Sequence, residues 1–182
     1  MKYLCEIIRE GGLKMITKYK VYILGLFISA AFLLCSVTSS SAAGYEALKG
    51  VESVKAVFDE RVGNPKVAVA HLDLIHKTFK DQSLTIKSRK PHLVVIFMGP
   101  AVKLVSKNTE GFTPEEQKDL GSIARIISDM SKDGIKLEIC MAAVRLMNVD
   151  PASILPEIKP VDNGWISAIG YQLKGYAYIA DF

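Results

Sequence analysis

Cys140 is the residue of this sequence whose type and position best suit it to chemistry. It lies between the alternating segment IKLEIC, residues 135–140, and the helix-forming segment MAAVRLM, residues 141–147. A cysteine at the carboxyl end of a strand and the start of a helix lies where open α/β sheets bind ligands, and the N–H groups of the helix stabilise a thiolate. Free cysteine elsewhere mostly packs as a small hydrophobic residue. Position alone therefore leaves two interpretations open, a reactive thiol and a packed one.

The N-terminal segment has the order of features that is typical of a secretion signal. Residues 21–37 (VYILGLFISAAFLLCSV) carry no charge, follow three lysines, and lead into the small residues SSSAA at positions 39–43. Cleavage after Ala43 would place Ser41 and Ala43 where signal peptidase requires small side chains. Met15 is an alternative start of the chain. Because the apolar run approaches the roughly 20 residues that span a bilayer, an uncleaved anchor helix is the alternative to the expected signal peptide over residues 1–43.

Export would change the charge and the cysteine content of the chain. Five of the 23 Lys and Arg residues and two of the 19 Asp and Glu residues lie in residues 1–43, which leaves 18 basic and 17 acidic residues. Residues 44–182 are therefore nearly neutral and lack the excess of basic residues that a nucleic-acid partner would require. Cys5 and Cys35 also lie in this segment, so Cys140 would remain as a single cysteine without an internal disulfide. We expect a periplasmic protein that meets the membrane only through its signal.

Other sites of known chemistry are not indicated by the sequence. His71 and His76 are five residues apart, whereas two metal ligands on one helical face need a spacing of three or four. The sequence has no phosphate loop, dinucleotide fingerprint, zinc spacing or Ser-His-Asp signature. We therefore expect no metal and no organic cofactor.

Strand and helix patterns alternate along residues 44–182. Strands are expected at residues 54–58, 92–98, 135–140, 158–161 and 176–180, and helices at residues 65–79, 114–133, 141–147 and 164–174, with short helical turns at 102–106 and 151–155. Each parallel crossover needs a covering helix, so this alternation predicts an α/β domain. The expected fold is a three-layer α/β/α domain with a mainly parallel sheet of about five strands.

Three segments resemble the DsrE/TusD-like sulfur-relay family, which is also called DsrE/DsrF-like. They are IKLEICMAA at residues 135–143, VVIFMGPAVKL at residues 94–104, and the run from Gly164-Trp165-Ile166 to Gly175-Tyr176-Ala177-Tyr178-Ile179. They occur in the family's order and belong to a similarity that covers about residues 51–182. The resemblance implies a three-layer fold, assembly into dimers, trimers or hexamers, and a persulfide held on the residue that matches Cys140.

From the resemblance we expect a sulfur-handling protein, either a sulfurtransferase or a sulfur carrier. Cys140 would accept sulfane sulfur as a persulfide and pass it to a thiol of a donor or acceptor protein. The expected substrate-binding residues are Met98 at the end of a strand, Gly99 in the turn that follows, and Met141 and Ala142, whose N–H groups begin the helix.

A second function class also fits the sequence. The family members that relay sulfur act in the cytoplasm, whereas this chain is expected to be exported, so a non-enzymatic domain that binds a small ligand or a protein in the strand-end crevice is the alternative. Arg145, one turn beyond Cys140, is either an anion contact or a solvated surface residue. Trp165 and Tyr171 are candidates for contacts in a homo-oligomer or for the core, with the wall of a pocket as a further alternative. The homo-oligomer is expected to be a trimer or hexamer.

Overall fold

The central sheet is parallel throughout. The computed structural model of the chain describes residues 44–180, and the secretion signal expected over residues 1–43 lies outside them. The strands are β1 (Lys55–Glu60), β2 (His92–Phe97), β3 (Lys136–Cys140), β4 (Lys159–Val161) and β5 (Ala177–Ala180). Their order is β4-β3-β2-β1-β5, and every neighbouring pair is parallel.

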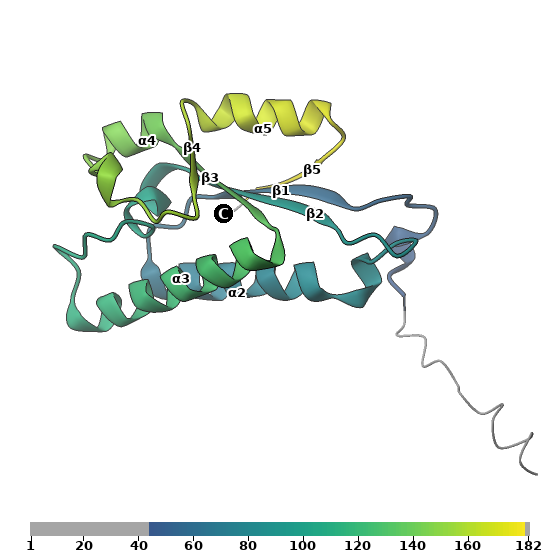
Figure 1. Cartoon of the computed structure of the whole chain (residues 1–182), viewed down its shortest axis with the longest axis horizontal. Coiled ribbons are helices and arrows are strands. Elements are labelled where there is room, and N and C mark those ends of the chain that lie inside the picture. Colours follow the sequence, from purple (N-terminus) through teal and green to yellow (C-terminus); the bar gives the residue numbers. More distant parts are fainter. Residues whose placement is uncertain (1–43, 181–182) are drawn as a thin grey trace, which may run out of the picture. The chain divides into compact units, whose positions relative to one another are not determined.

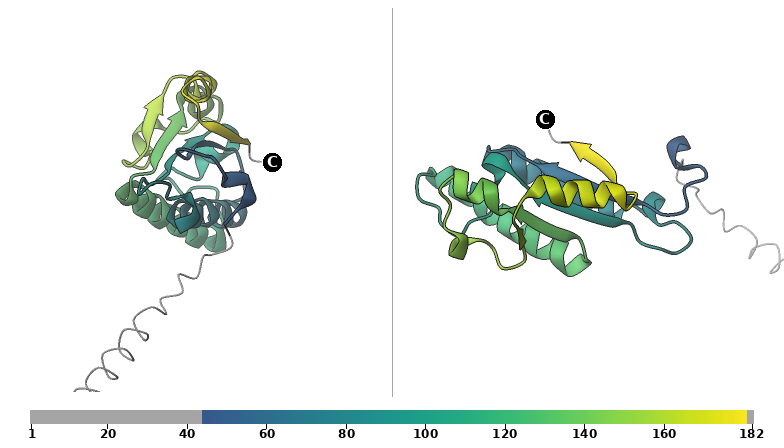
Figure 2. Two further views of the ribbon diagram at one scale, coloured as in Figure 1. Left: turned by 90° about the vertical axis from the view of Figure 1, so that its right-hand side faces the viewer. Right: turned by 90° about the horizontal axis from the view of Figure 1, so that it is seen from above.

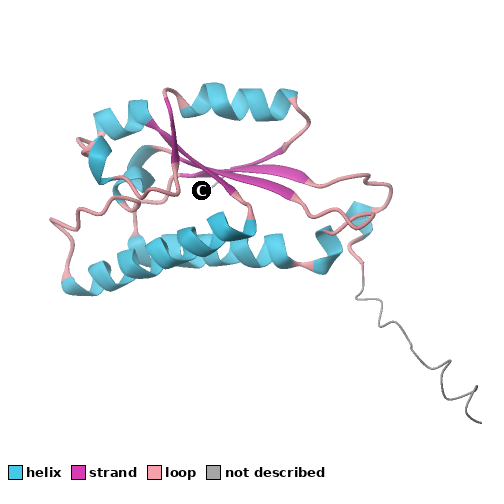
Figure 3. Ribbon diagram, viewed as in Figure 1, coloured by secondary structure: helices cyan, strands magenta, loops and turns pink. Residues whose placement is uncertain are grey.

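Helices cover both faces of this sheet. They are α2 (Pro65–Lys80), α3 (Pro114–Asp133), α4 (Met141–Leu146) and α5 (Gly164–Leu173), with short 3₁₀ turns at Glu46–Leu48, Gln82–Leu84, Gly99–Lys103 and Pro151–Ser153. Helices α2 and α3 pack together on one face, and α4 and α5 lie on the other (Figures 1 and 2). The expected three-layer α/β/α fold is confirmed (Figure 3). None of the helices within residues 44–180 combines the length and apolar character needed to span a bilayer.

The two long helices begin at side-chain caps. The Asn64 Oδ1 atom accepts a hydrogen bond from the backbone N–H of Val67 at 3.1 Å, ahead of a proline at the first helical position. Thr113 and Glu116 form a capping box before α3. A cap of this kind contributes about 1 kcal/mol. Apolar side chains at helical spacing then face the sheet: Ala68, Leu72, Ile75 and Phe79 from α2, and Leu120, Ile123, Ile127 and Met130 from α3.

The strand β2 lies in the middle of the sheet between β1 and β3. Its residues after His92 are all buried, which explains why its sequence HLVVIF is a continuous apolar run rather than an alternating one. The edge strands β4 and β5 have no buried residue. The core therefore centres on β2 and on the strands beside it.

A buried carboxylate holds α5 on the sheet. Glu138 of β3 is 7% exposed and accepts hydrogen bonds from the hydroxyl of Ser167 and, at 2.8 Å, from the hydroxyl of Tyr171. A buried carboxylate is tolerated only with such donors. Burial, followed by the hydrogen bond to Glu138, raises the pKa of Tyr171 above its ordinary value. The phenol of Tyr171 therefore remains a donor at neutral pH.

We predict that Tyr171→Phe lowers the free energy of unfolding by about 1 kcal/mol at pH 7, because Glu138 loses one of its two hydroxyl donors. The pKa of Tyr171 is higher in the folded protein than the value of about 10 in the unfolded chain. The stabilisation is therefore complete below pH 10 and decreases as the pH rises above it. Urea denaturation measures the change. Tyr176→Phe is the control, since it keeps the ring that contacts Tyr171, and an equal loss in that variant would contradict the prediction.

Candidate functional site

A cavity of about 220 Å³ lies where neighbouring strands end. Its lining includes Arg61 after β1, Met98 and Gly99 after β2, Cys140 at the end of β3, and Asn163 after β4. The remaining lining residues are Ala142, Ala143, Leu146 and Trp165, from α4 and α5. The cavity is smaller than the roughly 300 Å³ of sites for drug-sized ligands. It therefore suits a small ligand.

The thiol of Cys140 is largely buried beside this cavity. Cys140 is 6% exposed, ends β3 and is the N-cap residue of α4. Helix α4 has only six residues, so its dipole is weaker than that of a long helix. The backbone N–H of Ala142 donates to the carbonyl of Asp162 at 3.1 Å. The amide of Ala142 is thus already used in joining α4 to the segment after β4, contrary to the expected role of this N–H at the thiolate.

The predicted site residues are only partly brought together. Met98, Gly99 and Ala142 line the cavity with Cys140. Met141 is not among the lining residues, and its side chain packs against the core. Arg145 is exposed on α4 and does not line the cavity either. The substrate-binding roles of these residues remain predictions.

Two glycines shape the wall of the cavity. Gly99 has a φ of +52° and allows the chain to turn directly after β2. Gly164, the first residue of α5, lies so close to the site that a Cβ atom there would be 2.5 Å from Met98 Sδ and 3.1 Å from Cys140 Cβ. The absence of a side chain at Gly164 therefore allows α5 to begin against both sulfur-containing residues.

Arg61 is the site residue that the sequence did not indicate. Its Nε atom donates to both carboxylate oxygens of Asp59, at 2.9 and 2.8 Å, and its Nη2 atom lies 3.9 Å from Met98 Sδ. The strand β1 runs to Glu60, two residues beyond the expected end. Asp59 consequently lies within the sheet. The sequence signal for this site is a pair of opposite charges, Asp59 and Arg61, spaced by two residues at the end of a strand. Such a pair is also typical of an ordinary solvated turn.

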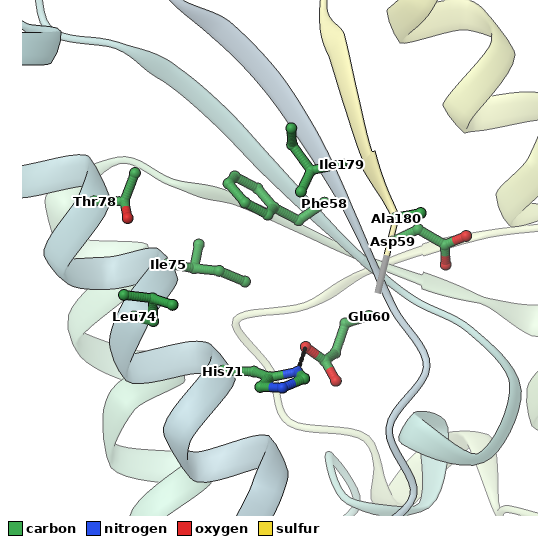
Figure 4. A pocket seen from close by; sticks show the side chains of 9 residues that line it. All are labelled: Phe58, Asp59, Glu60, His71, Leu74, Ile75, Thr78, Ile179 and Ala180. Carbon is green, nitrogen blue, oxygen red and sulfur yellow. Dashed lines mark ion pairs between the residues drawn. The ribbon is translucent and has the colours of Figure 1, made fainter. Parts of the chain in front are cut away.

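A second cavity of about 220 Å³ lies between β1, β5 and α2. Phe58, Leu74, Ile75 and Ile179 give it apolar walls, and the buried carboxylate of Glu60 lies at its polar end, with Glu60 Oε2 3.8 Å from His71 Nδ1 (Figure 4). Neighbouring side chains of a strand point to opposite faces, so Glu60 faces α2 whereas the carboxylate of Asp59 points to the other side. No thiol lines this second cavity in the described residues.

The two helical histidines have separate partners. His76 Nε2 lies 2.6 Å from Asp133 Oδ2 on α3, whereas His71 faces Glu60. Within residues 44–180, no three His, Cys, Asp or Glu residues are grouped so that they could hold a metal ion.

We predict that Gly164→Ala lowers the free energy of unfolding by about 1–3 kcal/mol, because its methyl group must displace Met98 or move α5 away from Cys140. Gly170→Ala in the same helix is the control, since nothing lies within 4 Å of its added Cβ. It should stabilise the protein by up to about 1 kcal/mol through helix propensity. Thermal or urea unfolding of both variants tests the difference. Equal effects would show that the close approach at Gly164 is unimportant.

Comparisons with known proteins agree with this fold. A model of the DsrE/DsrF-like family matches residues 29–180. An uncharacterized protein of Aquifex aeolicus (strain VF5) is 24% identical over 127 residues, which are 69% of this chain and 55% of the length of that relative. The chain thus spans little more than half of this relative.

Two solved structures share the fold at low sequence identity. One is MTH1491 from Methanobacterium thermoautotrophicum, described as a protein of unknown function, with a TM-score of 0.56 at 15% identity, covering 71% of this chain and 100% of that one. The other is the ychN protein of E. coli, with a TM-score of 0.51 at 11% identity, covering 70% and 99%. With the family match over most of its length, the chain belongs to the DsrE/DsrF-like family, a family of sulfur-relay type.

Proposed function

We propose that this chain is an exported, periplasmic sulfur-handling protein that accepts sulfane sulfur on Cys140 and carries it as a persulfide to an acceptor thiol. The observation that carries the proposal is the position of Cys140, which ends a central strand and lines a small cavity with Arg61. Cys140 is also the sole cysteine after residue 43. The signal over residues 1–43 remains part of this proposal.

The proposed chemistry is a displacement at sulfur. The thiolate of Cys140 attacks the sulfane sulfur of a donor, a new bond forms to Sγ, and the electron pair of the broken bond leaves with the remainder of the donor. Attack on the outer sulfur by an acceptor thiolate reverses this displacement and restores the Cys140 thiolate. Since the sulfur moves without net oxidation or reduction of the pair, the proposal includes no cofactor.

The burial of Cys140 fits a carrier better than an exposed nucleophile. At 6% exposure, the thiol itself is reached through the cavity. Adding one sulfur moves the reactive atom about 2 Å beyond Sγ, into space that the cavity provides. The outer sulfur would then lie nearer the cavity mouth than Cys140 Sγ does, and an acceptor thiol would reach it there.

We predict that the protein gains one sulfur atom when it is incubated with thiosulfate or a polysulfide. Replacing Cys5 and Cys35 by serine makes Cys140 the only thiol. Intact mass spectrometry should show the added sulfur, its removal by a reductant, and its absence in Cys140→Ser. Circular dichroism of Cys140→Ser separates lost chemistry from lost structure. If the folded protein never carries extra sulfur, the carrier function is wrong and a binding domain takes its place.

The outer face of α5 supports a role in assembly beside this chemistry. Four apolar side chains are exposed there: Trp165 (63%), Ile166 (68%), Ile169 (54%) and Leu173 (84%). At 100° per residue they fall within an arc of about 100°, and α5 contains no charged residue. Leu146 of α4, which is 75% exposed, lines the Cys140 cavity with Trp165. An exposed apolar patch of this kind marks an interaction surface.

We propose that a second copy of this chain covers this apolar α5 face, which comprises Trp165, Ile166, Ile169 and Leu173. An uncharged apolar helix face is complementary to itself across a two-fold axis, because no like charges are brought together. Three dimers formed in this way and joined by a further contact would give the hexamer, which with the trimer is one of the two expected assemblies. The contact would border the Cys140 cavity, since Trp165 belongs to both.

We predict that Ile169→Glu shifts the protein from an oligomer to smaller species, because two carboxylates would be buried at the two-fold contact. Light scattering coupled to size-exclusion chromatography measures the mass. Leu74→Glu is the matched control, since it places the same charge on an exposed apolar site of α2, on the opposite face of the sheet. Dissociation by Leu74→Glu alone, or a monomeric parent at high micromolar concentration, would rule out the α5 contact.

A further inference from the structure

Arg61 places a fixed positive charge at the Cys140 cavity. Among the described residues that line this cavity, it is the only charged one. Its Nη2 atom lies 3.9 Å from Met98 Sδ. Met98 and Cys140 both lie against Gly164, the first residue of α5. The guanidinium and the thiol are therefore two parts of the wall of one small cavity.

A buried carboxylate fixes the orientation of this guanidinium. The side chain of Asp59 is 3% exposed and that of Arg61 is 40% exposed, and Asp59 Oδ2 lies 2.8 Å from Arg61 Nη2. Arg61 Nε donates to both oxygens of Asp59, whose Oδ2 also accepts the hydroxyl hydrogen of Tyr178. Burial and the hydrogen bond to Asp59 raise the pKa of Tyr178, which keeps that donor protonated at neutral pH.

The charge distribution of this pair favours an anion in the cavity. Asp59 is buried behind Arg61, so the more exposed end of the pair is the positive one. A thiolate and an anionic sulfur donor repel each other, and the repulsion grows as water is excluded. A guanidinium that is already held in place offsets this repulsion without losing side-chain freedom when the donor binds. Its planar donors also match the oxygen atoms of an oxyanion.

We propose that Arg61, oriented by Asp59, recognises the anionic group of a small sulfane-sulfur donor such as thiosulfate or a polysulfide. The inference rests on the proposed sulfur-carrier function and assigns its donor class. With thiosulfate, the Cys140 thiolate attacks the outer sulfur, the Sγ–S bond forms and the S–S bond of the donor breaks. Sulfite leaves with the electron pair as a dianion, and the persulfide carries the remaining negative charge, so atoms and charges balance.

The test uses two reagents that modify thiols by a reaction that involves no transfer of sulfane sulfur. Sulfonatoethyl methanethiosulfonate is anionic and methyl methanethiosulfonate is neutral, and both form a mixed disulfide with Cys140 in the Cys5→Ser/Cys35→Ser protein. Arg61→Gln is expected to lower the rate with the anionic reagent about tenfold relative to the neutral one, which corresponds to losing one charged hydrogen bond. Arg61→Lys should retain part of the preference, since it keeps the charge. Arg145→Gln is the control, because Arg145 is exposed outside the cavity.

The neutral reagent also reports on folding. If Arg61→Gln unfolds because Asp59 loses its positively charged partner, the rate with the neutral reagent rises to that of free cysteine. The double variant Asp59→Asn/Arg61→Gln then supplies the comparison. Equal effects on both reagents, no effect, or an equal loss in Arg145→Gln would each overturn the inference. Arg61 could prove necessary for the preference for the anionic reagent while the protein gains no sulfur from thiosulfate or polysulfide. That result would support the anion site and rule out the carrier function and its donor. A parallel loss of sulfur gain in Arg61→Gln supports both.

Discussion

The parallel direction of all five strands is the constraint on which the candidate site depends. Parallel strands end at the same edge of a sheet, so Arg61, Met98, Cys140 and Asn163 meet although they lie at or just beyond the ends of four different strands. Reversing one strand of such a set would remove its residue from the cavity. The order β4-β3-β2-β1-β5 also places β3, with Cys140, inside the sheet rather than at an edge, which limits access to the thiol from the side.

Two buried carboxylates organise the face of the sheet that carries α4 and α5. Glu138 holds α5 through Ser167 and Tyr171, and Asp59 holds Arg61 with the help of Tyr178. Buried charges add little net stability because their desolvation is costly. Their effect here is positional: one fixes the helix that begins against Cys140, and the other fixes the guanidinium beside it. The opposite face is packed by the apolar side chains of α2 and α3, and its buried carboxylate, Glu60, faces His71 of α2.

Local patterns predicted most of the fold, whereas long-range contacts decided what was missed. Caps at Asn64 and Thr113 and the apolar run of β2 act within a few residues, so the elements were predictable from the sequence. Cys140, Met98 and Gly99 were predicted together because each lies at the end of a strand or directly after one. The strand order was not predictable, and Arg61 was missed because the Tyr178 hydroxyl that supports its carboxylate partner is 119 residues from Asp59. The closeness of Gly164 to two sulfur atoms likewise depends on how α5 crosses the sheet.

Helix α5 links the proposed chemistry to the proposed assembly. Its inner side is held by Glu138, its first residue packs against Met98 and Cys140, and its outer side exposes an apolar face. Trp165 belongs both to that face and to the cavity wall, so a partner that covers α5 also covers one side of the cavity mouth. Arg61 follows β1 and thus lines a different part of the wall. In the proposed assembly, an anionic donor small enough for a cavity of about 220 Å³ would therefore approach on the Arg61 side, whereas a second bulky molecule would compete with the partner at Trp165.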